Sequence, residues 1–204
     1  MNFTVERLRE RLLAEPPSLP LEPRRGDYDL DPAHRPPRPA KLTQAAVLMP
    51  IVEREEPSVL FTERSAALAR HAGQVSFPGG RIDAADESLV RTALRETQEE
   101  TGIAPEFVSV AGFLDAYETG TGFAILPVVG LLTPGFALVP DTNEVAEIFE
   151  VPLAFLLDPA NRGRDRMEWR GRLRSYYVFR YNGHTIWGAT AAMLVNFAER
   201  WNAE

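Results

Sequence analysis

The chain has 204 residues, 45% hydrophobic and 25% charged, a composition typical of a globular protein with one well-buried core. Its formal net charge of −7 at pH 7 argues against a nucleic-acid partner held by bulk electrostatics. The sequence contains no cysteine, which excludes disulfides, thiolate metal sites and a cysteine nucleophile.

The amino-terminal segment is amphipathic and charged, without the apolar stretch of a secretory signal. No apolar run approaches the ~20 residues that a membrane span needs. We therefore expect a cytoplasmic protein that binds neither a membrane nor nucleic acid. The oligomeric state stays open, a homodimer included.

The first forty residues differ in composition from the rest. Residues 3–14 mix apolar and charged side chains at helical spacing, and residues 16–40 are dense in proline. We predict an amino-terminal helix and a proline-rich arm over residues 1–40, followed by one folded domain over residues 41–204.

The domain is predicted to contain short strands and one strongly patterned helix. The helix is expected over residues 87–101, with Asp86 as its N-cap and Gly102 as its stop. β-rich runs predict strands at residues 45–52, 58–62, 75–77, 107–117, 124–132 and 147–151.

The carboxyl-terminal part predicts a small helix over residues 153–157 and a hairpin of residues 174–181 and 184–187, turning at Asn182-Gly183. A final helix is expected to start at Gly188, with apolar residues at helical spacing. Together these elements predict an α/β/α sandwich: a mixed sheet with a helix on each face.

The predicted helix over residues 87–101 carries three carboxylates on one side. Glu96, Glu99 and Glu100 stand at i, i+3 and i+4, a spacing at which like charges repel. Such acids can simply be solvated. Here, however, Arg95 and the upstream Gly79-Gly80 turn accompany them, and this combination favours a site for a hard divalent cation.

The segment Arg95-Glu96-Thr97-Gln98-Glu99-Glu100-Thr101-Gly102-Ile103 resembles the second half of the Nudix box. Thr97 stands where an aliphatic residue is usual, and Glu87 comes one place late when counted from Gly80. The resemblance implies a Nudix-like fold and hydrolysis of a nucleoside diphosphate derivative with Mg²⁺ or Mn²⁺. It implies Glu96 and Glu100 as metal ligands.

The resemblance leaves Glu99 either a third metal ligand or a base. The backbone of the turn is expected to lie beside the same ion, with Gly80 offering a metal ligand and Gly79 lying at the substrate. Arg95 is expected to hold Glu99 through an i,i+4 ion pair and to belong to the catalytic group.

The stretch Phe61–Gly80 resembles the signature of the coenzyme A pyrophosphatase branch of Nudix hydrolases, in which Thr-x-Arg-Ser leads to Phe-Pro-Gly-Gly. The segments 143–145, 151–153 and 186–191 resemble the same branch. Ala69 departs from the usual arginine, and Arg70 follows one residue later. The implied reaction converts coenzyme A to 3′,5′-ADP and 4′-phosphopantetheine, or to its acyl form.

Arginine suits this substrate because guanidinium binds phosphate oxygens in a bidentate manner. We expect Arg64, Ser65 and Arg70 to contact the substrate and Arg64 to read the 3′-phosphate. The general base stays open between Glu99 and a carboxylate of the later segment, Glu144 or Glu147.

Two other functions remain. A Nudix hydrolase of ADP-ribose or another nucleoside diphosphate derivative would share the box and differ in the upstream segment that carries Arg64 and Arg70. A nucleotide-sensing Nudix domain without turnover typically loses box carboxylates, whereas this chain keeps Glu96, Glu99 and Glu100. Catalysis is therefore favoured.

Overall fold

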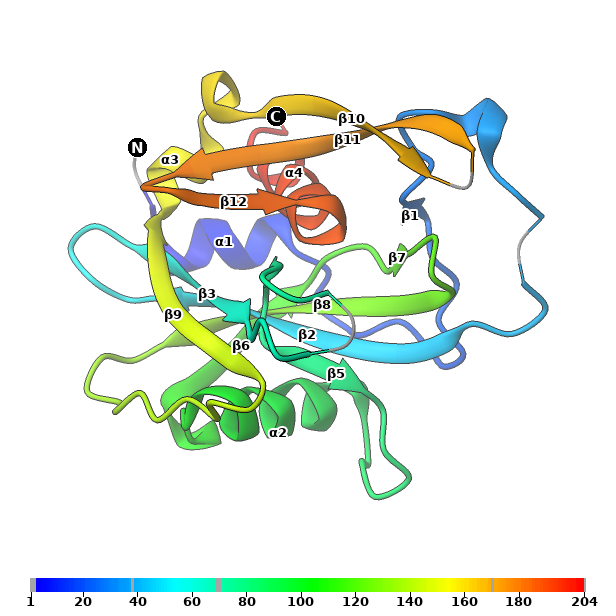
Figure 1. The fold of residues 1–204 in the computed structure, drawn as a ribbon. Helices are drawn as coiled ribbons and strands as arrows, with labels where there is room; N and C mark the ends of the chain where they lie inside the picture. Colours follow the sequence, from blue (N-terminus) through cyan, green and yellow to red (C-terminus); the bar gives the residue numbers. More distant parts are fainter. Residues whose placement is uncertain (1–2, 38, 69–70, 170, 204) are drawn as a thin grey trace.

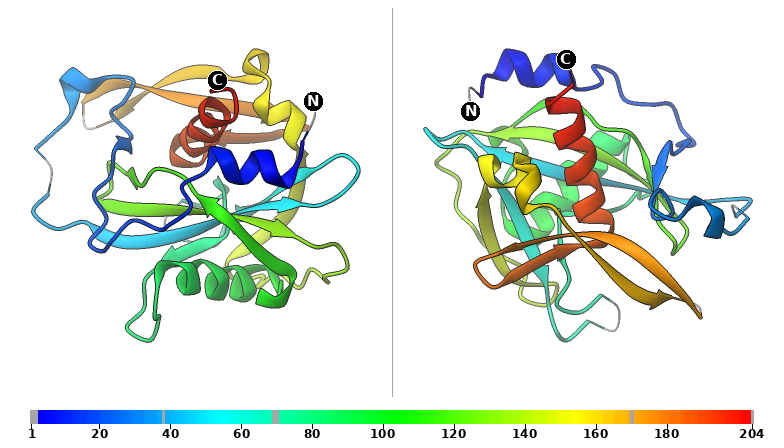
Figure 2. Two further views of the ribbon diagram at one scale, coloured as in Figure 1. Left: turned by 180° about the vertical axis from the view of Figure 1, so that it is seen from behind. Right: turned by 90° about the horizontal axis from the view of Figure 1, so that it is seen from above.

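The structure is a computed structural model that describes residues 3–37, 39–68, 71–169 and 171–203. A mixed central sheet separates helix α2, Leu89–Thr101, from helices α1, Val5–Arg11, and α4, Gly188–Trp201 (Figure 1). The view from behind in Figure 2 shows the same layers. The predicted α/β/α sandwich is confirmed.

The centre of the sheet is strand β2, Thr43–Val52, which pairs in parallel with β8, Phe123–Leu132, and antiparallel with β3, Ser58–Arg64. The remaining strands add to these three. They are β1 Arg25–Gly26, β4 Val75–Ser76, β5 Gly79–Arg81, β6 Val108–Phe113, β7 Tyr117–Glu118 and β9 Val145–Pro152. The strands predicted at residues 45–52 and 58–62 are therefore present, and they form an antiparallel pair.

Both faces of β2 are buried, so successive side chains enter different cores. Leu48 belongs to a cluster with Leu89 and Ala93 of α2. Met49, the next residue, belongs to a second cluster that includes Leu194 of α4. The helix that carries the box acids is thereby fixed to the sheet by a buried face.

Helix α2 starts two residues later than predicted. Its N-cap is Ser88, whose hydroxyl accepts from the backbone N–H of Arg91 at 3.2 Å. The expectation that Asp86 caps the helix is wrong, because the Asp86 carboxylate binds Arg95 and Thr92 instead. Gly102 ends the helix at φ 78°, a left-handed conformation that glycine adopts without strain.

A second sheet covers the outer side of α4 (Figure 1). It contains β10, Gly163–Trp169, β11, Arg172–Tyr181, and β12, His184–Trp187. The predicted turn at Asn182-Gly183 joins the last two strands, whereas β10 was not predicted. The small helix α3, Leu153–Leu157, matches its predicted bounds.

The amino-terminal segment lies against the domain. Leu8 and Leu12 are buried in the same core as α4, and Leu13 bridges to Phe113 of β6. Short 3₁₀ turns stand at Pro32–His34, Pro105–Phe107 and Pro159–Asn161. Within the described ranges, no helix combines the length and apolarity that crossing a bilayer demands.

Candidate active site

The Gly79-Gly80 turn touches the acidic side of α2. Gly80 pairs with Ala46 of β2, and a Cβ added to Gly80 would overlap the carboxyl group of Glu96. Gly79 has φ 153°, and its Cβ would overlap the backbone of Val47. Only glycine allows the turn to approach both the strand and the carboxylate this closely.

Glu100 is the buried member of the acidic group, with only 5% of its surface exposed. Burial raises the pKa of Glu100 to about 8, and the nearby charges of Glu96 and Glu144 push it in the same direction. The charge of Arg64 and a backbone hydrogen bond from Gly79 act against this rise. These relations place the sequence-predicted residues around one carboxylate.

Glu96 is less buried than Glu100, with 19% of its side chain exposed. Its pKa is raised by burial, an effect that the Arg95 guanidinium opposes and that Glu99 and Glu144 reinforce. Glu96 and Glu144 therefore belong to the same electrostatic group as Glu100.

Arg95 organises the carboxylates. Its Nη1 lies 3.0 Å from Glu96 Oε1 and 2.9 Å from Glu99 Oε2, and its Nε and Nη2 bind the two oxygens of Asp86 at 3.0 and 2.9 Å. The predicted Arg95–Glu99 pair is thus present. Because the guanidinium is occupied by these acids, Arg95 fits a positioning residue better than a catalytic one.

The loop carrying Glu144 is tied to the end of α2 and to the end of β3. The backbone N–H of Asp141 donates to Glu100 O at 3.2 Å, and Glu144 N–H donates to Asp141 O at 2.9 Å. Ser65 N–H donates to Glu144 O at 2.8 Å. The exposed Glu144 side chain is therefore anchored beside the acids by its backbone.

The structure describes Arg64 and Ser65. Ala69 and Arg70 lie outside the described residues. Arg64 stands at a register shift opposite Val145, and its Nε is buried without a hydrogen-bond partner among the described residues. The Ser65 hydroxyl accepts from the backbone N–H of Ala67 at 3.3 Å.

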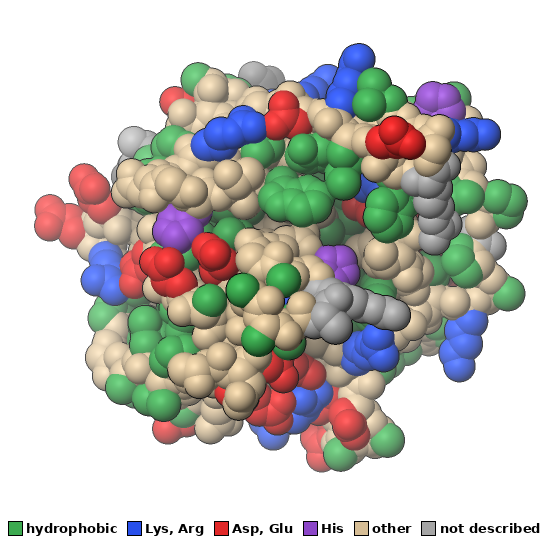
Figure 3. Space-filling view, viewed as in Figure 1, with side chains coloured by type: hydrophobic (Ala, Val, Ile, Leu, Met, Phe, Trp, Pro, Cys, Tyr) green, Lys and Arg blue, Asp and Glu red, His purple; other side chains and the backbone are tan. Residues whose placement is uncertain are grey.

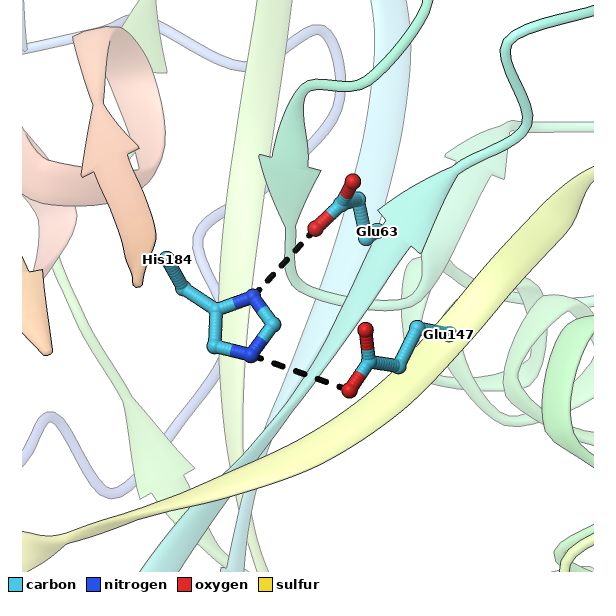
Figure 4. Close-up of side chains that lie close together, drawn as sticks. All are labelled: Glu63, Glu147 and His184. Atoms are coloured by element: carbon cyan, nitrogen blue, oxygen red, sulfur yellow. Dashed lines mark hydrogen bonds and ion pairs between the residues drawn. The ribbon is translucent and has the colours of Figure 1, made fainter. Parts of the chain in front are cut away.

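Glu147, one of the alternatives for the base, lies elsewhere. It pairs across β9 and β3 with Glu63, and both carboxylates face His184 at the start of β12 (Figure 4). His184 Nδ1 is 3.3 Å from Glu63 and Nε2 is 3.7 Å from Glu147, while the ring stacks on Phe149 at 3.7 Å. Glu144, by contrast, acts electrostatically on Glu96 and Glu100.

The Glu63–Glu147–His184 cluster was missed by sequence reasoning because its members come from three separate strands. One ligand atom from each residue lies within 4.8 Å of the others, so the cluster could hold a metal ion. The exact pairing of Glu63 with Glu147 depends on strand register, which no local pattern in the sequence indicates.

The α2 acids fit a hard divalent cation. The atoms that they offer as metal ligands are carboxylate oxygens, which Mg²⁺ and Mn²⁺ prefer. Glu100 Oε2 is buried and has no hydrogen-bond partner among the described residues, and the bare backbone at Gly80 adjoins Glu96. A buried acceptor left without a donor is costly unless a ligand completes it.

Comparisons with known proteins bear on the family of this chain. The NUDIX domain model matches residues 42–169. The chain is 42% identical over 169 residues to a Photorhabdus laumondii protein named "Uncharacterized Nudix hydrolase NudL", covering 81% of this chain and 90% of that protein. A Cronobacter sakazakii protein of the same name is 43% identical over 155 residues, covering 76% and 81%.

Among solved structures, a C. elegans Ap4A hydrolase in a binary complex is 18% identical at a TM-score of 0.47, covering 54% of this chain and 80% of that chain. The family model spans well over half of the chain, and the two bacterial relatives match most of it. The chain therefore belongs to the Nudix family of hydrolases, which act on pyrophosphate bonds.

Proposed function

We propose that this protein hydrolyses the diphosphate of coenzyme A or its derivatives, using Mg²⁺ or Mn²⁺, to 3′,5′-ADP and 4′-phosphopantetheine or its acyl form. The observation that carries the hydrolytic part is the convergence of Glu96, Glu100 and Arg64 at the Gly79-Gly80 turn. The choice of coenzyme A rests on the signature over residues 61–80.

Glu96 and Glu100 would hold the metal ion, with Glu99 and the Gly80 backbone as further candidates. When bound, such an ion lowers the pKa of a coordinated water and neutralises charge on the phosphates. Arg95 keeps Glu96 and Glu99 in place through its ion pairs.

Arg64 supplies positive charge on the substrate side. Its buried Nε has no hydrogen-bond partner among the described residues, and its charge acts on Glu100. This position beside the metal-binding acids supports a contact with the diphosphate in place of the 3′-phosphate that the sequence interpretation assigned to it. A guanidinium there neutralises negative charge that develops on the leaving phosphate.

A carboxylate must accept the proton of the attacking water. Glu144 is the favoured base because it is solvent-accessible, acts electrostatically on both Glu96 and Glu100, and is anchored by Ser65. Glu99 is the alternative, but Arg95 already holds its carboxylate at 2.9 Å.

The proposal is tested by incubating the purified protein with coenzyme A, ADP-ribose and NADH, first in Mg²⁺ and then in Mn²⁺, and identifying the products by mass. We expect 3′,5′-ADP and 4′-phosphopantetheine to form fastest. Faster release of AMP and ribose 5-phosphate from ADP-ribose would favour the other hydrolase. Metal-independent binding without any product would indicate a sensing domain.

A further inference from the structure

A small cavity lies between the second sheet and the segment just before β4. It is lined by aromatic residues of β10, β11 and β12, namely Trp169, Tyr176 and Trp187, and by Gln74 from the segment before β4. Figure 3 shows hydrophobic side chains, with a histidine beside them, gathered in the middle of this face. The cavity thus joins two stretches that the sequence analysis considered separately, Phe61–Gly80 and residues 186–191.

The size of the cavity indicates what it can hold. Its volume is about 130 Å³. Pockets that enclose a whole drug-sized ligand measure about 300–1,000 Å³. This cavity therefore accommodates one part of a ligand, such as a single ring system.

The walls favour a neutral, flat group. Trp169, Tyr176 and Trp187 are each half-buried, and the rings of the last two lie 5.5 Å apart at 57°. Arg174, which also lines the cavity, forms an ion pair with Asp27 at 2.9 Å. Its charge is thereby balanced, and the rings of Tyr176 and Trp187 offer faces on which a flat group can stack.

Gln74 adds an oriented polar group. Its Oε1 lies 2.7 Å from His71 Nδ1, so the amide oxygen is engaged and the amide nitrogen is left as a donor. That nitrogen would lie 3.6 Å from a Cβ built on Gly188, at the first residue of α4. A carboxamide beside aromatic rings matches the acceptor edge of a purine.

The cavity lies within reach of the α2 acids along the chain. Gln74 O accepts from Arg64 N–H at 3.0 Å, and Arg64 O accepts from Gly73 N–H at 3.0 Å. Five residue steps separate Gln74 from Gly79, which corresponds to at most about 17 Å. One nucleotide-sized molecule can therefore occupy both places.

We propose that this cavity is the subsite for the nucleobase of the substrate, with the ring stacking on Trp187 and Tyr176 and accepting from Gln74. The inference rests on the proposed function in that the diphosphate of the same molecule lies at Glu96 and Glu100. The aromatic residues of β11 and β12 thereby gain a role in selecting nucleotides.

The test uses the indole N–H signals of the protein in NMR spectra, recorded with adenosine and a metal chelator. The sequence has three tryptophans. Trp169 and Trp187 line the cavity, whereas Trp201 is 2% exposed and stacks on Phe3 on the other side of α4. Adenosine carries no phosphate, so the measurement does not depend on turnover.

We expect adenosine to shift the signals of Trp187 and Trp169 saturably and to leave that of Trp201 in place. Tyr176→Leu and Gln74→Ala should each weaken this binding, by about tenfold for the stacking residue. Glu100→Gln should retain it. Failure of coenzyme A hydrolysis with intact adenosine binding would count against the proposed function alone.

Two results would overturn the subsite. Adenosine at millimolar concentration could leave all three indole signals unmoved. Alternatively, pantetheine could shift Trp187 and Trp169 while adenosine does not, which would assign the cavity to the other arm of the substrate.

Discussion

The positive charge of Arg64 acts on the carboxylate of Glu100, and each of the two residues keeps one buried polar atom without a hydrogen-bond partner among the described residues. Arg64 offers Nε and Glu100 offers Oε2. A buried donor and a buried acceptor that both lack a partner match a ligand that brings both phosphate oxygens and a cation. This pair connects the end of strand β3, which carries Arg64, to helix α2, which carries the acids of the Nudix box.

Replacing Gly80 with alanine tests the close approach of the turn to Glu96. The new Cβ would overlap the Glu96 carboxyl group, which is the mobile end of its side chain and can move away. We expect Gly80→Ala to lower kcat about 10²-fold while the fold survives, because a displaced catalytic group is costly. Steady-state kinetics and urea unfolding measure the two effects. Wild-type kcat would contradict the placement of Glu96.

The choice of base is tested by two matched variants. Glu144 acts on Glu96 and Glu100, whereas Glu147 faces His184. Glu144→Gln should lower kcat by about 10²–10⁴-fold, the usual contribution of general base catalysis. Glu147→Gln should stay near the wild-type rate. If Glu99→Gln alone gives the large loss, Glu99 is the base.

Arg64→Ala is expected to impair hydrolysis of coenzyme A and of its 3′-dephospho form by similar factors, about 10²-fold in kcat/KM. The reason is the location of Arg64 beside Glu100, where it meets the diphosphate that both substrates share. Parallel assays of the two substrates decide the matter. A loss confined to coenzyme A would show that Arg64 reads the 3′-phosphate.

Asp86 should contribute pH-dependent stability. Its two hydrogen bonds from the Arg95 guanidinium hold the pKa of Asp86 well below its ordinary value. A carboxyl group with a lowered pKa stabilises the fold above its unfolded pKa of about 3.9 and loses this contribution as the pH falls further. Asp86→Asn should therefore lower the free energy of unfolding at pH 7 by about 2 kcal/mol.

The difference between Asp86→Asn and wild type should shrink as the pH falls below about 4, when urea unfolding is repeated there. Asp165→Asn is the matched control, since Asp165 also pairs with an arginine but is 43% exposed. Its cost should stay below about 1 kcal/mol. Equal costs for the two variants would contradict the structural role of Asp86.

The periodic spacing of apolar residues was sufficient to predict the elements that have a buried apolar face. Helix α4 and the β11–β12 hairpin follow from apolar spacing and from the Asn182-Gly183 turn. Strand β10 could not be predicted in this way, because Gly163–Trp169 is rich in charged residues and, in the part of the chain that the structure describes, pairs with β11 alone. Its strand conformation is imposed by the partner.

The same distinction applies to the candidate site. Residues on one helix could be grouped from the sequence, whereas tertiary contacts between elements could not be predicted. The acids of α2 share one helix, so their spacing indicated the group directly. The local position of Asp86 predicts an N-cap, whereas its tertiary contact with Arg95 decides its role. Glu63, Glu147 and His184 meet through strand pairing and hairpin docking, which a local pattern does not encode.

The most direct measurement is anomalous diffraction from a crystal of this protein soaked in Mn²⁺. The account predicts an anomalous peak bonded to Glu96 and Glu100 beside the Gly79-Gly80 turn, which disappears in Glu100→Gln. A peak at Glu63, Glu147 and His184 alone, with none at Glu96 and Glu100, would contradict the assignment of the α2 acids as the catalytic metal site.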